Sequence, residues 1–220
     1  MNAPVRDPDV QEVSLLTDGV PLGGFLGVPE APRGLVIFAH GSGSSRFSSR
    51  NNAVARDLRA CALATLLFDL LTDTESRDRA RVFDIVLLAR RLGAATRWAM
   101  DDPRTQGLAV GYFGASTGAA AALAAAAEPG AAIGAVVSRG GRPDLAAPLL
   151  DRVTAPTLLI VGGHDEQVRA LNESAQARMK APCDLVVVPG ATHLFEEPGA
   201  MERVSELAGQ WFVAHLAGRA

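Results

Sequence analysis

A serine lies at the centre of the pentapeptide Gly114-Ala115-Ser116-Thr117-Gly118, between an apolar run and an alanine-rich segment. Residues 107–113 are typical of a buried strand, and residues 116–127 are typical of a helix. A Gly-x-Ser-x-Gly pattern at such a junction predicts a sharp, strained turn that needs small neighbours. The turn would lift the hydroxyl above the strand ends, beside the free N–H groups of the helix. We therefore predict that Ser116 is a nucleophile.

A serine hydroxyl needs a base to take its proton, and the base needs a carboxylate to hold its tautomer. Both should follow strands, because the loops at the carboxyl ends of parallel strands share one crevice. His193 lies in a short loop after the last predicted strand, residues 185–188, and is the predicted base. His164 also follows a strand and is the alternative, although its direct neighbour Asp165 could not easily orient it.

Asp165 follows the strand predicted at residues 156–161 and is the predicted acid, with Glu166 as the fallback. A helix is predicted from residue 167, so Asp165 could instead cap this helix and stabilise it by about 1 kcal/mol. The two roles are only partly compatible, because a capping oxygen is already occupied by backbone N–H groups.

The glycine-rich turn at residues 40–45 (His-Gly-Ser-Gly-Ser-Ser) follows another predicted strand. Such a turn could bind a phosphate, but it lacks the lysine of a P-loop and the third glycine of a dinucleotide motif. The other interpretation is an oxyanion hole, in which one N–H donor lowers the barrier by ~3 kcal/mol. We predict the N–H groups of Ser42 and Thr117 as the donors. Gly43 is the alternative to Ser42, and His40 is expected to brace the turn.

Arg139 and Arg46 are candidate substrate-binding residues, because both follow segments that end at the predicted crevice. Either guanidinium could bind a substrate carboxylate or phosphate through two hydrogen bonds. Lys180 is the only lysine among 21 basic residues, so solvated arginines in an arginine-rich chain are the competing interpretation. The histidines are scattered without carboxylates at ligand spacing, so we predict no metal site and no cofactor.

Apolar segments alternate with amphipathic segments along the chain. Strands are predicted at residues 12–16, 20–28, 34–39, 63–68, 107–113, 131–137, 156–161 and 185–188. Helices are predicted at residues 51–61, 82–102, 116–127, 143–150, 167–179 and 198–216. This alternation predicts right-handed crossovers and a mostly parallel sheet flanked by helices, in a single α/β domain over residues 1–220.

Composition excludes several classes of partner. The net charge of −3 and the pI near 5.8 argue against nucleic acid and anionic membranes. Residues 1–8 contain no apolar core of a signal peptide, and residues 119–127 are too short to span a membrane. We therefore expect a cytoplasmic protein, in which the two cysteines, Cys61 and Cys183, are buried thiols.

Four short motifs occur in a fixed order: His40-Gly41-Ser42-Gly43, Gly114-x-Ser116-x-Gly118, Gly162-x-x-Asp165-x-x-Val168 and Gly190-x-x-His193. This ordered set resembles the α/β-hydrolase superfamily and, within it, small serine hydrolases similar to dienelactone hydrolases. The resemblance implies the α/β-hydrolase fold, with eight strands of which the second is antiparallel, and a Ser116–His193–Asp165 triad without a cofactor. It also implies no cap domain, because only a short loop and helix follow residue 137. Dienelactone hydrolases carry a cysteine nucleophile, so Ser116 favours general esterase chemistry.

The resulting expectation is hydrolysis of small carboxylic esters or lactones through an acyl-serine, with a small molecule as the partner and a homodimer as an open alternative. A thioesterase or peptidase would use the same triad. A non-catalytic binder of a small ligand on the same fold is the remaining hypothesis. It is disfavoured because candidates for all three triad residues are present.

Overall fold

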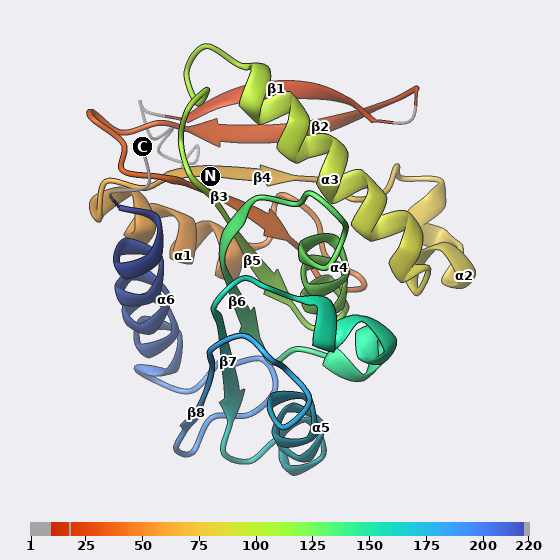
Figure 1. Ribbon diagram of the computed structural model, residues 1–220, viewed down its shortest axis with the longest axis vertical. Coiled ribbons are helices and arrows are strands. Elements are labelled where there is room, and N and C mark those ends of the chain that lie inside the picture. The colour runs from red at the N-terminus through yellow and green to blue at the C-terminus, as the bar shows by residue number, and fades with distance from the viewer. Residues whose placement is uncertain (1–9, 18, 218–220) are drawn as a thin grey trace, which may run out of the picture.

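The computed structural model describes residues 10–17 and 19–217, which form one eight-stranded sheet with helices on both faces (Figure 1). The order across the sheet is β1-β2-β4-β3-β5-β6-β7-β8. β2 runs antiparallel to β1 and β4, and the pairs from β4 to β8 are parallel, as predicted. The strands are β1 (Val10–Thr17), β2 (Val20–Gly27), β3 (Leu35–Ala39), β4 (Ala64–Phe68), β5 (Val110–Ala115), β6 (Ile133–Arg139), β7 (Thr157–Gly162) and β8 (Cys183–Val188).

The helices divide between the two faces of the sheet. α1 (Ser49–Ala60) and α6 (Ala200–Leu216) pack together on one face, whereas α3 (Ile85–Asp101), α4 (Thr117–Ala126) and α5 (Glu166–Gln176) cover the other (Figure 1). Successive residues of a strand point to opposite faces, so each face has its own core. Ile37 and Tyr112 lie in the core beneath α3 and α4, and Phe38 and Phe113 lie in the core beneath α1 and α6.

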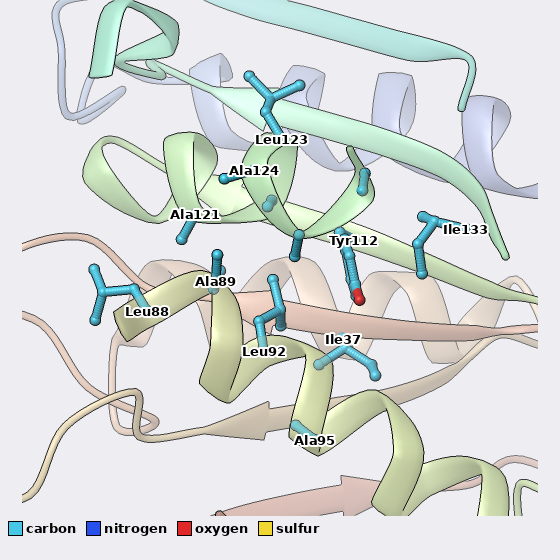
Figure 2. Close-up of a cluster of buried hydrophobic side chains, with 14 of the residues drawn as sticks. Ile37, Leu88, Ala89, Leu92, Ala95, Tyr112, Ala121, Leu123, Ala124 and Ile133 are labelled. Carbon is cyan, nitrogen blue, oxygen red and sulfur yellow. The ribbon is translucent and has the colours of Figure 1, made fainter. Parts of the chain in front are cut away.

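Helix α4 lies at the centre of its layer, and every one of its residues is buried. Nine of its ten residues are Ala, Gly or Thr, so neighbouring elements can approach its backbone closely. Leu88, Ala89, Leu92 and Ala95 of α3 face it, with Tyr112 and Ile37 of the sheet below (Figure 2). This close packing fixes the N-terminus of α4, where the predicted nucleophile lies.

The prediction of one long helix over residues 82–102 is wrong at the start of this range. The chain forms a 3₁₀ turn, η1 (Glu75–Arg77), and a short helix, α2 (Arg79–Val82), before α3 begins at Ile85. Asp84 separates the two helices, because its side chain accepts the Leu87 N–H at 3.0 Å and caps α3. Val86, at the start of α3, is 75% exposed.

Other boundaries shift by a few residues. β5 begins at Val110, since Gly107 makes a turn with φ +80°, and it continues to Ala115, directly before Ser116. The segment between β6 and β7 contains the 3₁₀ helix η2 (Pro143–Arg152) and short loops, so no cap domain lies there. Both cysteines are free thiols, but Cys61 is exposed at the end of α1 and Cys183 is only half-buried, which corrects the prediction that both are buried.

Residues 1–9, to which the prediction about a signal peptide applies, lie outside the described residues. No helix within residues 10–17 and 19–217 has both the length and the apolar character needed to cross a membrane.

Candidate active site

Ser116 lies on a strained turn between β5 and α4. Its φ is 51° and its ψ is −119°, a left-handed conformation that non-glycine residues rarely adopt. The turn has no room for larger neighbours: a Cβ on Gly114 would lie 2.4 Å from Cα of Ala119, and one on Gly118 would lie 2.1 Å from the carbonyl oxygen of Ala39. The predicted need for small residues in this turn is therefore confirmed.

Asp165 and His193 are brought together from loops after β7 and β8. Nδ1 of His193 lies 2.6 Å from Oδ2 of Asp165, a short hydrogen bond. Asp165 occupies the N-cap position of α5, yet its side chain makes no capping hydrogen bond. Its carboxylate is thus available to the imidazole, and its partner is His193 and not the exposed His164.

Gly140 links the Ser116 turn to His193. The preceding residue, Arg139, accepts the Ser116 N–H at its carbonyl oxygen over 3.2 Å. A Cβ on Gly140 would lie 3.3 Å from the carbonyl oxygen of His193 and 3.5 Å from its Nδ1. The backbones around Ser116 and His193 therefore meet at one turn. Within the described residues no hydrogen bond joins the Ser116 hydroxyl to the imidazole, so that part of the triad stays a prediction.

The glycine-rich turn after β3 lies directly against the nucleophile turn. A Cβ on Gly41 would be 3.1 Å from Cβ of Ser116. The N–H of Ser42, a predicted oxyanion donor, donates to Oγ1 of Thr117 at 2.9 Å. In the part of the chain that the structure describes, the N–H of Gly43 makes no hydrogen bond, which leaves the alternative donor free. The N–H of Thr117 is at the first position of α4, where a helix offers no internal acceptor.

His40 braces this turn, as predicted. Its Nε2 accepts the Leu70 N–H at 3.0 Å, and its Nδ1 lies 3.0 Å from the carbonyl oxygen of Gly41. Burial lowers the pKa of the imidazole, which favours the neutral form that can accept one hydrogen bond and donate the other. His40 thus joins the turn to the segment after β4.

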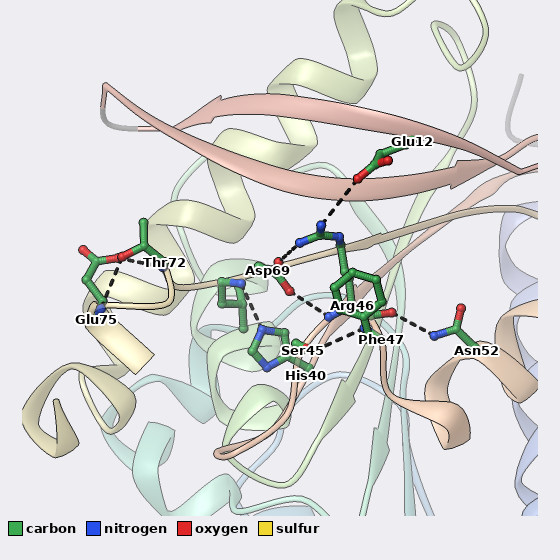
Figure 3. A network of polar contacts seen from close by, with 10 residues as sticks. Glu12, His40, Ser45, Arg46, Phe47, Asn52, Asp69, Thr72 and Glu75 are labelled. Carbon is green, nitrogen blue, oxygen red and sulfur yellow. Dashed lines mark hydrogen bonds and ion pairs between the residues drawn. The ribbon is translucent and has the colours of Figure 1, made fainter. Parts of the chain in front are cut away.

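Arg46 is paired with neighbouring side chains. The guanidinium of Arg46 pairs with Asp69, and the backbone N–H of Arg46 donates to Oδ1 of Asp69 at 2.8 Å (Figure 3). It also stacks on Phe47, 4.3 Å from the ring centroid, and reaches Glu12 at 3.5 Å. Its charge is compensated by these contacts, and its contact with a substrate stays a prediction.

Arg139 has the opposite environment. It is 7% exposed, its guanidinium makes one hydrogen bond within the described residues, a long one of 3.5 Å to Oδ1 of Asn51, and its Nε has no partner. Burial, together with the charge of Arg50, lowers the pKa of its guanidinium to about 10. The ring of Phe195 lies beneath it, 5.8 Å away.

A cavity of about 230 Å³ opens beside Thr117. One wall is the glycine-rich turn at residues 40–45. The other is formed by Leu71 of the segment after β4, Val82 at the end of α2 and Leu88 in the first turn of α3. The wall formed by the segment after β4 depends on an ion pair that the sequence did not indicate. Arg91, which is 2% exposed, binds Glu75 at 2.7 and 2.8 Å and the carbonyl oxygen of Leu70 at 2.8 Å. Hydrogen bonding to Arg91 lowers the pKa of Glu75 to about 2.

Among the described residues, no group of three or more His, Cys, Asp or Glu side chains could hold a metal ion. The arrangement instead juxtaposes a strained serine, a histidine–carboxylate pair and backbone N–H groups at a helix N-terminus. These groups can support nucleophilic attack and stabilise an oxyanion.

A model of the dienelactone hydrolase family matches residues 63–212 of this chain. Two proteins of Mycobacterium tuberculosis, from strains CDC 1551 and H37Rv, are each 60% identical to the chain over 215 residues. Each carries the provisional name of a phosphoribosyl transferase. The match covers 98% of this chain and 48% of each relative, so the chain spans about half the length of these relatives.

The chain is also similar to solved structures. A protein of Anabaena variabilis, described as a dienelactone hydrolase, is 54% identical with a TM-score of 0.91, over 94% of this chain and 99% of that one. Est1E of Butyrivibrio proteoclasticus is 18% identical with a TM-score of 0.80, over 93% of this chain and 98% of that one. The second likeness concerns the fold alone, which is that of the α/β-hydrolases.

Proposed function

Because this chain belongs to the dienelactone hydrolase family, we propose that it is a serine hydrolase of small carboxylic esters or lactones. The observation that carries the proposal is the 2.6 Å hydrogen bond between His193 and Asp165, formed by two loops that end beside the Ser116 turn. A histidine oriented by a carboxylate next to a half-buried, strained serine is the arrangement that acyl transfer requires.

In the proposed reaction, Nε2 of His193 takes the proton of the Ser116 hydroxyl, and Oγ of Ser116 attacks the ester carbonyl. Asp165 accepts a hydrogen bond from Nδ1–H of His193 and stabilises the imidazolium that forms. The N–H of Thr117, together with that of Ser42 or Gly43, receives the developing oxyanion. The imidazolium then protonates the departing alcohol, and water, activated by His193, releases the acid from the acyl-serine.

The cavity beside Thr117 supports small acyl groups as substrates. Its volume of about 230 Å³ is below the range typical of sites for drug-sized ligands, and its walls combine the polar turn at residues 40–45 with apolar side chains. The interval between β6 and β7 contains only η2, so no cap extends the site over a long chain. Short-chain esters should therefore be better substrates than long-chain esters.

Thioesters and amides could be cleaved by the same groups, and the leaving group is a matter for substrate profiling. A non-catalytic binder is a weaker candidate, because such a protein has no need of the His193–Asp165 pair. We propose no transferase activity: the relatives named for it are about twice as long, and residues 63–212 of the shared region match the hydrolase family.

The test combines a fluorophosphonate label with nitrophenyl esters of increasing acyl length. Wild type should be labelled and should hydrolyse acetyl and butyryl esters, whereas Ser116→Ala should lose both properties because the nucleophile is gone. Ser174→Ala, at an exposed serine of α5, is the matched control and should behave as wild type. Labelling that persists in Ser116→Ala would remove this serine from the mechanism.

A further inference from the structure

The side chain of Thr117 carries a hydrogen-bond donor that the described residues do not use. Thr117 is the first residue of α4, is 3% exposed and lines the cavity of about 230 Å³. Its Oγ1 accepts the backbone N–H of Ser42 at 2.9 Å. A hydroxyl also has one hydrogen to donate, and no group in the described part of the chain accepts it. An unused buried donor is unfavourable unless water or a ligand satisfies it.

Other buried threonines use the same hydrogen within the protein. Thr96, Thr105 and Thr157 donate to backbone carbonyl oxygens at 3.0, 2.6 and 3.0 Å. A helical threonine commonly reaches back to a carbonyl three or four residues before it, but for Thr117 those residues lie in β5. β5 pairs with a strand on each side, so its carbonyl oxygens are already engaged. The donor of Thr117 is therefore left for the cavity.

The Thr117 hydroxyl lies among the groups predicted to stabilise the oxyanion. One predicted donor is the N–H of the same residue, and the other candidates, Ser42 and Gly43, belong to the turn that Oγ1 contacts. A Cβ on Gly41 would lie 3.1 Å from Cβ of Ser116, so this turn and Ser116 are directly adjacent. The Ser42 N–H also polarises the hydroxyl, because a group that accepts one hydrogen bond becomes a stronger donor of the next.

We propose that the Thr117 hydroxyl is a catalytic group that donates a hydrogen bond to the oxyanion of the tetrahedral intermediate. The proposal rests on the function proposed above and adds a catalytic side chain to it. As Oγ of Ser116 attacks, the carbonyl electron pair moves onto the carbonyl oxygen, and the Thr117 hydroxyl turns its hydrogen toward this charge without giving it up. The Ser42 N–H then acts through Thr117, whereas the N–H groups of Gly43 and Thr117 contact the oxyanion directly.

The test replaces Thr117 by Val, which removes the hydroxyl and keeps a side chain of nearly the same shape. In Thr117→Val, kcat for nitrophenyl acetate should fall roughly 100-fold, as is typical of one lost oxyanion donor, with KM within about threefold of wild type. Thr117→Ser retains the hydroxyl and should keep kcat within about tenfold of wild type. Thr154→Val, at an exposed loop threonine between η2 and β7, is the matched control and should behave as wild type.

The Tm of Thr117→Val should stay close to that of wild type, because the Ser42 N–H belongs to an exposed residue and can bind water instead. An unchanged or raised kcat in Thr117→Val would refute the proposal, since the hydroxyl would then only occupy the Ser42 N–H. A fall in Tm together with a raised KM, or a loss of kcat that Thr117→Ser does not restore, would also refute it. The side chain would then only hold the turn at residues 40–45 in place.

A transition-state analogue separates this proposal from the proposed function. A methyl trifluoroketone adds to a reactive serine and forms a tetrahedral oxyanion without turnover. Its Kd should rise in Thr117→Val by about the same factor as kcat/KM falls, and Thr117→Ser should restore it. If wild type binds the ketone at Ser116 but hydrolyses no ester, the esterase is refuted and the ketone affinities still decide the role of Thr117. If wild type neither binds the ketone nor hydrolyses an ester, both proposals are wrong.

Discussion

Replacement of Asp165 by Asn separates two roles that the sequence allows for this residue, a catalytic carboxylate and a helix cap. The substitution preserves the shape of the side chain and removes its charge. Because the Asp165 side chain makes no capping hydrogen bond to α5, the loss of charge should change the free energy of unfolding by less than about 1 kcal/mol. The effect on catalysis should be much larger.

The magnitude follows from the contact with His193. Oδ2 of Asp165 lies 2.6 Å from Nδ1, so the charges of the carboxylate and the imidazolium are centred about 4 Å apart. At an effective dielectric constant near 20, charges at that separation attract by about 4 kcal/mol. The imidazolium forms only as Ser116 loses its proton, so this attraction stabilises the transition state and not the resting enzyme. Asp165→Asn should therefore lower kcat by about a thousandfold.

The assay is kcat for a short nitrophenyl ester, with Tm measured on the same preparations. Glu166→Gln is the matched control, since Glu166 is adjacent and exposed, and is the alternative to Asp165 as the catalytic acid in the prediction from the sequence. It should keep kcat within about twofold of wild type, because exposed charges are screened by water. If Asp165→Asn kept kcat within about tenfold of wild type, or lost Tm and kcat together, the catalytic assignment of the carboxylate would be wrong.

Two further predictions concern the scaffold. Glu75→Gln should destabilise the protein at neutral pH by roughly 2 kcal/mol, less than the ~3 kcal/mol of the full pKa shift because Glu75 is 21% exposed. The Glu75 carboxylate binds a proton more tightly in the unfolded chain, so this stabilisation is complete above pH 4.5 and is lost as the pH falls towards about 2. In urea unfolding, the difference in free energy of unfolding between wild type and variant should therefore be smaller at about pH 3 than at about pH 7. Gly118→Ala should not yield folded protein, since its Cβ would lie 2.1 Å from the oxygen of Ala39, whereas Gly43→Ala, which meets open space at φ +69°, should still fold and lose only about 1 kcal/mol in the same unfolding assay.

The sheet and the order of the candidate residues could be predicted from the sequence, because both depend on local patterns. Buried parallel strands appear as apolar runs, and polar residues directly after them lie at one edge of the sheet. Asp165 and His193 are separated by 27 residues in the chain, yet each follows a strand of the same adjacent pair, β7 and β8. Their contact follows from that adjacency.

The environment of the arginines could not be predicted, because it depends on contacts between distant segments. Arg46 and Arg139 are equivalent in the sequence: both follow strand ends and both lie near glycines. Arg46 is neutralised by Asp69 after β4 and by Glu12 on β1. Arg139 lies over the ring of Phe195 with no carboxylate beside it within the described residues. Only the packing of the layers distinguishes an arginine that is paired with carboxylates from one that has none beside it.

The same limit applies to the oxyanion hole. The pattern predicts Ser42 and Thr117 as donors through their backbone N–H groups, and backbone positions follow from the turn and the helix start. It does not reveal that the Thr117 side chain accepts the Ser42 N–H at 2.9 Å, because that contact depends on one side-chain rotamer across 75 residues of chain. The Thr117 hydroxyl holds the glycine-rich turn at residues 40–45 against Ser116 before substrate binds. For Ser42 to serve the oxyanion, this hydrogen bond must be shared or broken as charge develops, whereas Gly43 has its N–H already free.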